Sequence, residues 1–215
     1  KPDLDKIRAQ RGGKGLIGPG VIEICRAADI AFLALHGAEG ENGKLQACLD
    51  LYGVPYTGSG YLGSALAMDK ELSKILFRSS GIPTPPGVTL RRGAAVPESI
   101  GFPCVVKPCS GGSSVGTSIV TESEKLHGAL EEAFSCDEAV LVEKYIRARE
   151  LTVGVMDGRA MAVIEIIPKT GFYDYKNKYQ AGLTEEICPA PISAEDTERV
   201  QRLAERVYEA LHLDA

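Results

Sequence analysis

A glycine- and serine-rich stretch lies between two short apolar segments in the middle of the chain. Residues 107–116 read Lys-Pro-Cys-Ser-Gly-Gly-Ser-Ser-Val-Gly, after a predicted strand over 103–108 and before a second over 117–120. The glycines let the backbone turn tightly and aim N–H groups at an anion, and two serines add hydroxyl donors. A P-loop would need a lysine after the last glycine and then a helix, and no Rossmann G-x-G-x-x-G is present. Taken alone, the stretch predicts either an anion-binding loop or a simple flexible hairpin.

Before this stretch, strand and helix patterns alternate, which indicates an α/β architecture. The apolar run 30–35 predicts a buried strand, and 54–57 predicts another. Three prolines within 82–87 predict a stiff connector and a domain boundary. Helices are predicted over 43–52, after Gly60, and after Asp69, which can act as an N-cap for a helix with Leu72, Ile75 and Leu76 on one face.

After the stretch, the pattern predicts a helix, a strand, a hairpin and a last helix. Thr121 and Glu124 have the spacing of a capping box. A strand is expected over 139–143, and Asp157-Gly158 predicts a type I′ turn in a hairpin over 150–167. The stretch 169–189 is expected to be a long functional loop, and the last helix to span 194–211. The helix after the capping box has an apolar face of Leu126, Ala129, Leu130, Ala133 and Phe134.

Charge and composition exclude several classes of function. The net charge is −5 without a basic stripe, which argues against a nucleic-acid partner. No apolar run reaches the roughly 18 residues of a membrane span. The six cysteines contain no C-x-x-C pair and predict reduced thiols of a cytoplasmic protein. The three histidines are far apart in the sequence, so no histidine metal site is expected.

Two carboxylates follow the strand over 139–143. Glu143 stands at the end of that strand and is suited to accept a hydrogen bond from the polar edge of an adenine. Glu150, seven residues later, is suited to hold ribose hydroxyls. By themselves these residues are more typical of a solvated charged turn.

Five segments together resemble the D-alanine–D-alanine ligases, a family with the ATP-grasp fold. Residues 102–116 resemble the nucleotide-binding hairpin of that family. The resemblance extends over nearly the whole chain, and its segments follow the family order. The other four segments are 34–43, 55–60, 64–70 and 172–179.

The resemblance implies a fold class and a domain organisation. It implies an α/β (α+β) ATP-grasp protein, with residues 1–82 as part of an N-terminal α/β substrate domain. Residues 83–155 would form a small central lid domain, and 156–215 the start of a C-terminal domain with the closing loop. Compared with the family pattern, the chain is expected to begin after the first glycine-rich turn and to stop before the carboxylates that bind two Mg²⁺. No metal ligand is therefore expected before Ala215. The resemblance further implies a cytoplasmic homodimer.

The resemblance also assigns roles to particular residues. Catalytic roles fall to Ser113, Lys178 and Tyr179. His36 and Glu41 would lie near the substrates, although His36 would also suit an ordinary loop position. The residues expected to bind ATP are Lys70, Lys107, Ser114, Glu143, Tyr145, Ile146, Glu150 and Phe172.

The implied reaction joins two D-alanines for peptidoglycan precursor synthesis. ATP would phosphorylate one D-alanine to an acyl phosphate, and the amine of the second would attack it. The alternatives are a D-alanine–D-serine or D-alanine–D-lactate ligase, a nucleotide-binding module without catalysis, and an unrelated ATP-grasp ligase. Tyr179 argues against the lactate enzyme, and the Phe-Tyr-Asp-Tyr sequence of 172–175 argues against the unrelated ligase. Lys176 and Asn177 depart from the pattern of many relatives.

Overall fold

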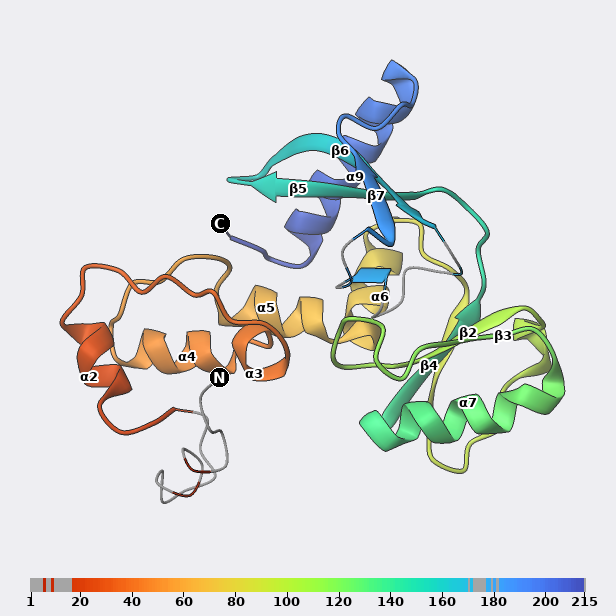
Figure 1. The fold of residues 1–215 in the computed structure, drawn as a ribbon, viewed down its shortest axis with the longest axis horizontal. Helices are drawn as coiled ribbons and strands as arrows, with labels where there is room; N and C mark the ends of the chain where they lie inside the picture. Colours follow the sequence, from red (N-terminus) through yellow and green to blue (C-terminus); the bar gives the residue numbers. More distant parts are fainter. Residues whose placement is uncertain are drawn as a thin grey trace.

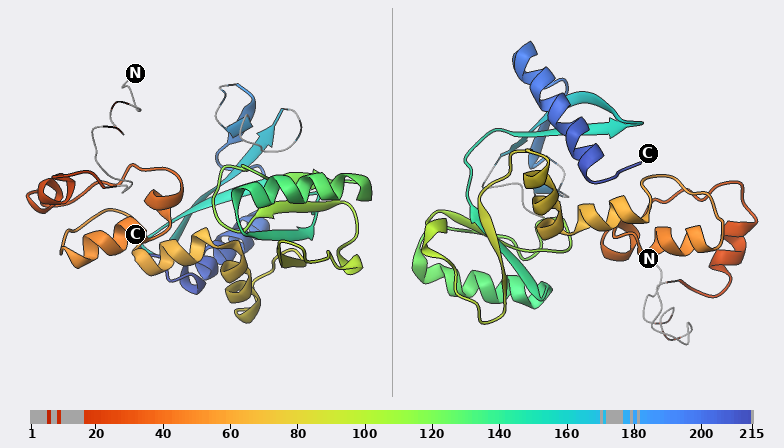
Figure 2. Two further views of the ribbon diagram at one scale, coloured as in Figure 1. Left: turned by 90° about the horizontal axis from the view of Figure 1, so that it is seen from below. Right: turned by 180° about the vertical axis from the view of Figure 1, so that it is seen from behind.

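The elements of the chain gather into three groups in space. The computed structural model describes residues 6, 9, 17–169, 171, 177, 178, 180 and 182–214. Figure 1 shows short helices near the N-terminus, a sheet covered by one long helix, and a second sheet that carries the last helix. Two further directions of view give the same grouping (Figure 2). Within the described part of the chain, no helix is both long and apolar enough to cross a membrane.

The first group consists of four short helices. Two of them confirm the predicted positions of helices after Gly43 and Gly60. The prediction of a buried strand over 30–35 is wrong, because only Ala31 forms a bridge, with Tyr56, and Phe32 is 80% exposed. The same bridge is all that represents the strand predicted over 54–57. The helices are α2 (Val21–Arg26), α3 (Ala38–Glu41), α4 (Lys44–Leu51) and α5 (Tyr61–Met68).

Helix α6 (Lys70–Ser79) connects this group to the first sheet. Asp69 is its N-cap, as predicted, and the carboxylate accepts hydrogen bonds from the N–H groups of two first-turn residues. The predicted apolar face is not the buried one. Leu72 and Ile75 are exposed, whereas Ser73 and Lys74 are buried. The helix therefore turns a polar face toward the protein interior.

The first sheet has four antiparallel strands in the order β1-β4-β2-β3. Strands β2, β3 and β4 confirm the predicted strands, and β1 was not predicted. A short 3₁₀ turn, η1 (Glu98–Ile100), follows β1. The strands are β1 (Gly87–Arg91), β2 (Cys104–Pro108), β3 (Ser118–Val120) and β4 (Ala139–Lys144).

Helix α7 (Ser123–Cys136) covers one face of this sheet and forms the main core with it. Val106, Val140 and Val142 point into this core and are fully buried. The predicted apolar face of α7 is confirmed, because all five of its residues belong to the core or pack against it. The prediction of a capping box at Thr121 and Glu124 is wrong, because the N-cap is Glu122 and its side chain makes no capping hydrogen bond. Since side chains alternate along a strand, the other face carries Val105, Lys107, Leu141 and Glu143.

The second sheet has three antiparallel strands, β5 (Glu150–Met156), β6 (Arg159–Pro168) and β7 (Thr184–Ile187), in that order. Asp157 and Gly158 both have positive φ, 50° and 72°, as the predicted type I′ turn requires. Strand β7 corrects the prediction that 169–189 is all loop. Helix α9 (Ala194–Ala210) packs on β5 and β6, and Arg206 donates to the Ser80 carbonyl, 2.7 Å away, at the end of α6.

Candidate nucleotide site

A cavity of about 580 Å³ lies between the two sheets. Its size falls within the range typical of small-molecule sites. Val105 and Ile119 form an apolar wall from the first sheet, and the C-terminal end of β6 forms the opposite wall. The remaining lining comes from the glycine-rich loop, the connection from β4 to β5, and two residues after β6. The lining residues are Val105, Ser114, Thr117, Ile119, Tyr145, Ile146, Ala148, Arg149, Glu150, Glu165, Ile166, Ile167, Pro168, Gly171 and Lys178.

The glycine-rich loop has an unusual backbone at its two serines. Ser113 and Ser114 have φ of 53° and 59°, a left-handed conformation that non-glycine residues rarely adopt outside turns and functional sites. Tight turns hold this conformation: the Thr117 N–H donates to the Ser114 carbonyl at 3.2 Å. At the start of the loop, the Asp137 carboxylate accepts a 2.7 Å hydrogen bond from the Ser110 N–H. The loop is thus a built turn, and Ser114 faces the cavity.

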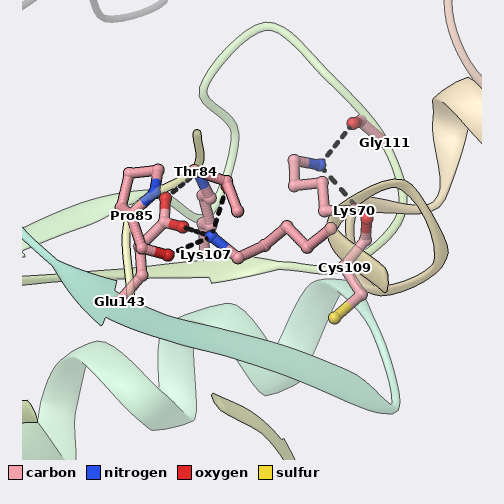
Figure 3. Close-up of polar contacts among 8 residues, drawn as sticks. Lys70, Thr84, Pro85, Lys107, Cys109, Gly111 and Glu143 are labelled. Atoms are coloured by element: carbon pink, nitrogen blue, oxygen red, sulfur yellow. Dashed lines mark hydrogen bonds and ion pairs between the residues drawn. The ribbon is translucent and has the colours of Figure 1, made fainter. Parts of the chain in front are cut away.

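Lys70 is hydrogen-bonded to the same loop. Its Nζ donates to the carbonyls of Gly111, at 2.8 Å, and Cys109, at 3.3 Å (Figure 3). Burial lowers the pKa of Lys70, and the positive charge of Lys107 lowers it further. Two ammonium groups that repel each other beside one loop form a site suited to a multiply charged anion.

Glu143 lies between two lysines on the face of the sheet that α7 does not cover. Its Oε2 is 2.6 Å from Nζ of Lys74, and its Oε1 accepts a hydrogen bond from Lys107. Figure 3 shows the Glu143 carboxylate and the Lys107 side chain turned toward each other. Burial opposes ionisation of Glu143, but the two lysines outweigh burial and hold its pKa below the usual value. Glu143 is therefore an ionised, buried group, only 6% exposed.

Cross-strand geometry explains the contact between Lys107 and Glu143. Val105 on β2 pairs directly with Glu143 on β4, and Lys107 lies two residues further along β2. Lys107 and Glu143 are therefore diagonal neighbours on one face of the sheet, within reach of long side chains. The same alternation places Val105 in the cavity wall and Lys107 beside it.

The connection from β4 to β5 forms one edge of the cavity. The N–H groups of Lys144 and Tyr145 donate to the carbonyls of Pro86, at 2.9 Å, and Pro103, at 3.1 Å. These two N–H groups are thus committed within the protein. Partial burial raises the pKa of Glu150, and the positive charge of Lys178 opposes that effect.

Arg149 and Glu165 close the corner where the connection meets the second sheet. The guanidinium donates two hydrogen bonds of 2.6 Å, one to each oxygen of Glu165. A third bond, of 3.2 Å, reaches the Pro191 carbonyl. This fork-shaped pairing is geometrically specific, so it fixes the connection relative to β6.

The structure brings most of the predicted site residues together. Five of them line the cavity, and Lys70, Lys107 and Glu143 lie at the loop and strands beside it. Ser113 precedes Ser114 in the loop but is not a lining residue. The five lining residues are Ser114, Tyr145, Ile146, Glu150 and Lys178.

The remaining predicted residues are not placed at this cavity. His36 and Glu41 belong to the N-terminal helical group, and neither lines it. Glu41 instead accepts a 2.7 Å hydrogen bond from the Gly37 N–H at the start of its own short helix. Phe172 and Tyr179 lie outside the described residues, so their roles stay predictions.

Sequence reasoning missed Lys74, Arg149 and the wall residue Val105. A signal for Lys74 did exist, because it follows Lys70 by four residues and so lies on the same face of α6. Val105 precedes Lys107 by two residues, which places it on the same face of β2. No comparable local pattern identifies the partner of Arg149.

The two halves of the chain match two models of one family. Residues 76–215 match the C-terminal domain of D-ala D-ala ligases. Residues 5–59 match the N-terminal domain of the same enzymes. The chain belongs to the D-alanine–D-alanine ligase family. The fold is therefore the mixed helix-and-sheet ATP-grasp fold that the family resemblance implied.

Individual members of the family are similar over most of the chain. The D-alanine–D-alanine ligase of Geobacter sulfurreducens is 48% identical over 186 residues, which cover 85% of this chain and 59% of that protein. The enzyme of Lacticaseibacillus casei is 45% identical over 202 residues, or 93% of this chain and 56% of that protein. The chain thus spans less than two thirds of the length of these relatives.

Solved structures of the family show the same fold. The Bacillus anthracis D-alanine–D-alanine ligase complexed with ATP superposes with a TM-score of 0.79 at 36% identity, over 91% of this chain and 64% of that one. The VanG D-Ala:D-Ser ligase of Enterococcus faecalis gives 0.73 at 34% identity, over 87% of this chain and 57% of that one.

Proposed function

We propose that the protein containing this chain is an ATP-dependent D-alanine–D-alanine ligase, and that the cavity between the sheets binds the nucleotide. One observation carries the proposal: Lys70 is hydrogen-bonded to a glycine-rich loop, Lys107 lies on the strand that leads into it, and the loop borders a cavity of nucleotide size. The relative of this family that was solved with ATP supports the choice of nucleotide.

In this proposal each side of the cavity binds a different part of ATP. The apolar wall around Val105 and Ile119 packs on the adenine, next to Tyr145 and Ile146. Glu150 accepts hydrogen bonds from the ribose hydroxyls. A carboxylate has about four lone-pair sites, so Glu143 keeps capacity for the adenine amino group beside its two lysines. Phe172, on the closing loop, covers the base.

The polyphosphate then lies along the glycine-rich loop. Lys70 and Lys107 offset its charge, and Ser113 and Ser114 donate hydrogen bonds from the loop as it closes. Two lysines matter here, because the Coulomb attraction between an ammonium and a phosphate about 4 Å apart is on the order of 4 kcal/mol at a surface-like dielectric.

The reaction follows from this placement. The γ-phosphoryl group passes to the carboxylate of a first D-alanine, and the amine of a second attacks the resulting acyl phosphate and releases phosphate. Lys178 neutralises charge on the transferred group, and Tyr179 and Ser113 orient the first D-alanine. His36 and Glu41 contribute from the N-terminal side. Closure of the loop around Lys178 excludes water, which would hydrolyse the acyl phosphate.

Magnesium is part of the proposal but not of the described site. Mg²⁺ bound to ATP would neutralise phosphate oxygens in the transition state. Among the described residues, no group of three or more His, Cys, Asp or Glu side chains lies close enough together to hold a metal ion. No step above depends on the ion.

The wider setting of the enzyme is also proposed. We infer peptidoglycan precursor synthesis in the cytoplasm, a role in cell shape, and a homodimer. All six cysteines are free thiols, which supports a reducing compartment. We infer a division into 1–82, 83–155 and 156–215, with the nucleotide between the last two. The three groups of elements support three parts, although β5 (Glu150–Met156) pairs with β6 in the second sheet, which favours a second boundary before Glu150.

The test is phosphate release from ATP by the protein that contains this chain. D-Alanine should stimulate release strongly, whereas L-alanine should not, and Lys107→Met should abolish the stimulation. Equal stimulation by L-alanine would refute the substrate. Faster dipeptide formation with D-serine, or depsipeptide formation with D-lactate, as second substrate would identify one of the related ligases. ATP binding that no amino acid converts into phosphate release would identify a nucleotide-binding module.

A further inference from the structure

Lys74 is a buried cation whose hydrogen-bonding capacity is fully used inside the protein. Its Nζ donates to Thr84 Oγ1 at 2.9 Å, to the Pro85 carbonyl at 2.6 Å and to Glu143 Oε2 at 2.6 Å. An ammonium group has three protons, and these three acceptors account for all of them. The residue is only 5% exposed. Lys74 is therefore fixed in place and has no proton left for a ligand.

Lys107 shares the same carboxylate but is differently placed. Its side chain is 24% exposed, and it donates to the other oxygen of Glu143. It lies on the strand face that also carries the cavity-wall residue Val105. The two carboxylate oxygens of Glu143 thus bond to two different lysines. One is buried and donates only to protein acceptors, and the other lies beside the cavity.

The net charge of Lys74, Lys107 and Glu143 depends on whether Lys74 is present as a cation. Two ammonium groups and one carboxylate give a net charge of +1, and that charge is available at Lys107, next to the cavity. If Lys74 were neutral, Glu143 and Lys107 would form a neutral pair. An anion at the cavity would then have to compete with Glu143 for Lys107.

We propose that Lys74 is a positioning residue for the nucleotide site: it neutralises Glu143 from the protein side and thereby leaves the charge of Lys107 available to the polyphosphate. The inference rests on the proposed ATP site. Lys74 itself touches no substrate and acts only through Glu143. Stability alone would not favour this arrangement, because a buried ion pair is seldom more stabilising than well-packed apolar side chains.

The test compares the affinities for ATP and adenosine, because their ratio isolates the contribution of the phosphates. Both ligands compete against a fluorescent ATP analogue on the protein that contains this chain. The variant Lys74→Met should lower the ratio roughly tenfold, as expected when a unit charge near the phosphates is cancelled. The double variant Lys74→Met/Glu143→Gln removes one charge of each sign and should recover most of the ratio. Arg78→Met removes an exposed charge one turn along α6 and should leave the ratio unchanged.

Several outcomes would decide against the proposal. If Lys74→Met weakens ATP and adenosine equally, Lys74 only supports the fold. If the added Glu143→Gln substitution brings no recovery, charge balance is not the cause. Should Lys74→Met fail to fold, Glu143→Gln alone still tests the idea, because it should raise the ratio; a fall would overturn it. A wild-type protein that binds ATP no better than adenosine would refute the proposed function itself.

Discussion

Gly87 on β1 lies directly opposite Glu143 on β4, and there is no room between them for a side chain. A Cβ atom at Gly87 would be 2.6 Å from Cβ of Glu143 and 2.9 Å from the carbonyl oxygen of Val142. Real Cβ contacts are never so short, so the sheet would have to shift. Glu143 can occupy its place between the two lysines because its neighbour across the ladder is a glycine.

Substitution of Gly87 should therefore disturb both stability and the site. Gly87→Ala is expected to lower the free energy of unfolding by about 1–3 kcal/mol, as overpacking does, and to weaken ATP binding by displacing Glu143. Urea unfolding and nucleotide titration measure the two effects. Gly128→Ala is the matched control: Gly128 lies on the exposed side of α7, and a Cβ there meets nothing within 4 Å. It should stabilise the protein by about 0.5–1 kcal/mol. Equal stability of Gly87→Ala and the wild type would contradict the steric argument.

The hydrogen bonds of Asp137 at the base of the glycine-rich loop should make the stability of the protein depend on pH. Burial alone would raise its pKa, but hydrogen bonds from the N–H groups of Ser110 and Ala139 outweigh burial and hold the pKa below its ordinary value of 3.8. A pKa that is lower in the folded state means stability that is present above the unfolded pKa and is lost as the pH falls through the folded one. Asp137→Asn should thus cost about 1 kcal/mol at pH 7.

The pH profile gives this prediction its control. The stability difference between Asp137→Asn and the wild type should shrink below pH 3.8 and vanish once the native carboxyl is protonated. Denaturant unfolding at several pH values measures it. A difference that stays constant down to low pH would show that the carboxylate charge does not contribute.

Local signals determined which parts of the fold were predictable. The hairpin of β5 and β6 was predictable because Asp157-Gly158 supplies two positive φ angles that few other dipeptides adopt. Helix α7 was predictable because its apolar spacing matches the core that it covers. The run 30–35 has the composition of a buried strand, but burial depends on neighbouring elements on both faces. In the described structure, only the bridge from Ala31 to Tyr56 is present there.

For the site, the sequence indicated the lysines at the loop but not how Glu143 is held. The spacing from Lys70 places Lys74 on the same face of α6, but a lysine on an amphipathic helix is ordinarily solvated, so that spacing does not mark Lys74 as buried. Its partner is 69 residues away in the sequence. Glu143 was interpreted only as a group that faces the adenine, and the structure adds a lysine partner for each of its oxygens. Such tertiary pairings have no sequence periodicity and become visible only in the folded chain.

Glu150 should distinguish ribose from sugars without hydroxyl groups. If its carboxylate holds the ribose, the wild type should bind ATP at least about tenfold more tightly than 2′,3′-dideoxy-ATP, since hydrogen bonds to charged groups contribute about 1.5–3 kcal/mol. Glu150→Ala should reduce that preference to near unity by weakening ATP alone. Competition binding measures both ligands. Glu124→Ala, at the exposed start of α7, should keep the full preference. A preference unchanged in Glu150→Ala would remove Glu150 from the ribose site.

The two lysines at the loop should have separable effects. Lys70 is hydrogen-bonded to the Gly111 and Cys109 carbonyls, whereas Lys107 is paired with Glu143. Lys70→Met and Lys107→Met should each weaken ATP binding by roughly tenfold or more through the lost charge. Only Lys70→Met should also loosen the loop, because it alone removes hydrogen bonds to the loop backbone.

Amide hydrogen exchange of the ligand-free protein distinguishes the two variants. Amides of residues 112–117 should exchange faster in Lys70→Met than in the wild type, and at the wild-type rate in Lys107→Met, because local opening follows the loss of local contacts. The Thr117 N–H, which donates to the Ser114 carbonyl, is the most informative probe. Equal exchange in both variants would show that Lys70 contributes charge alone and does not shape the loop.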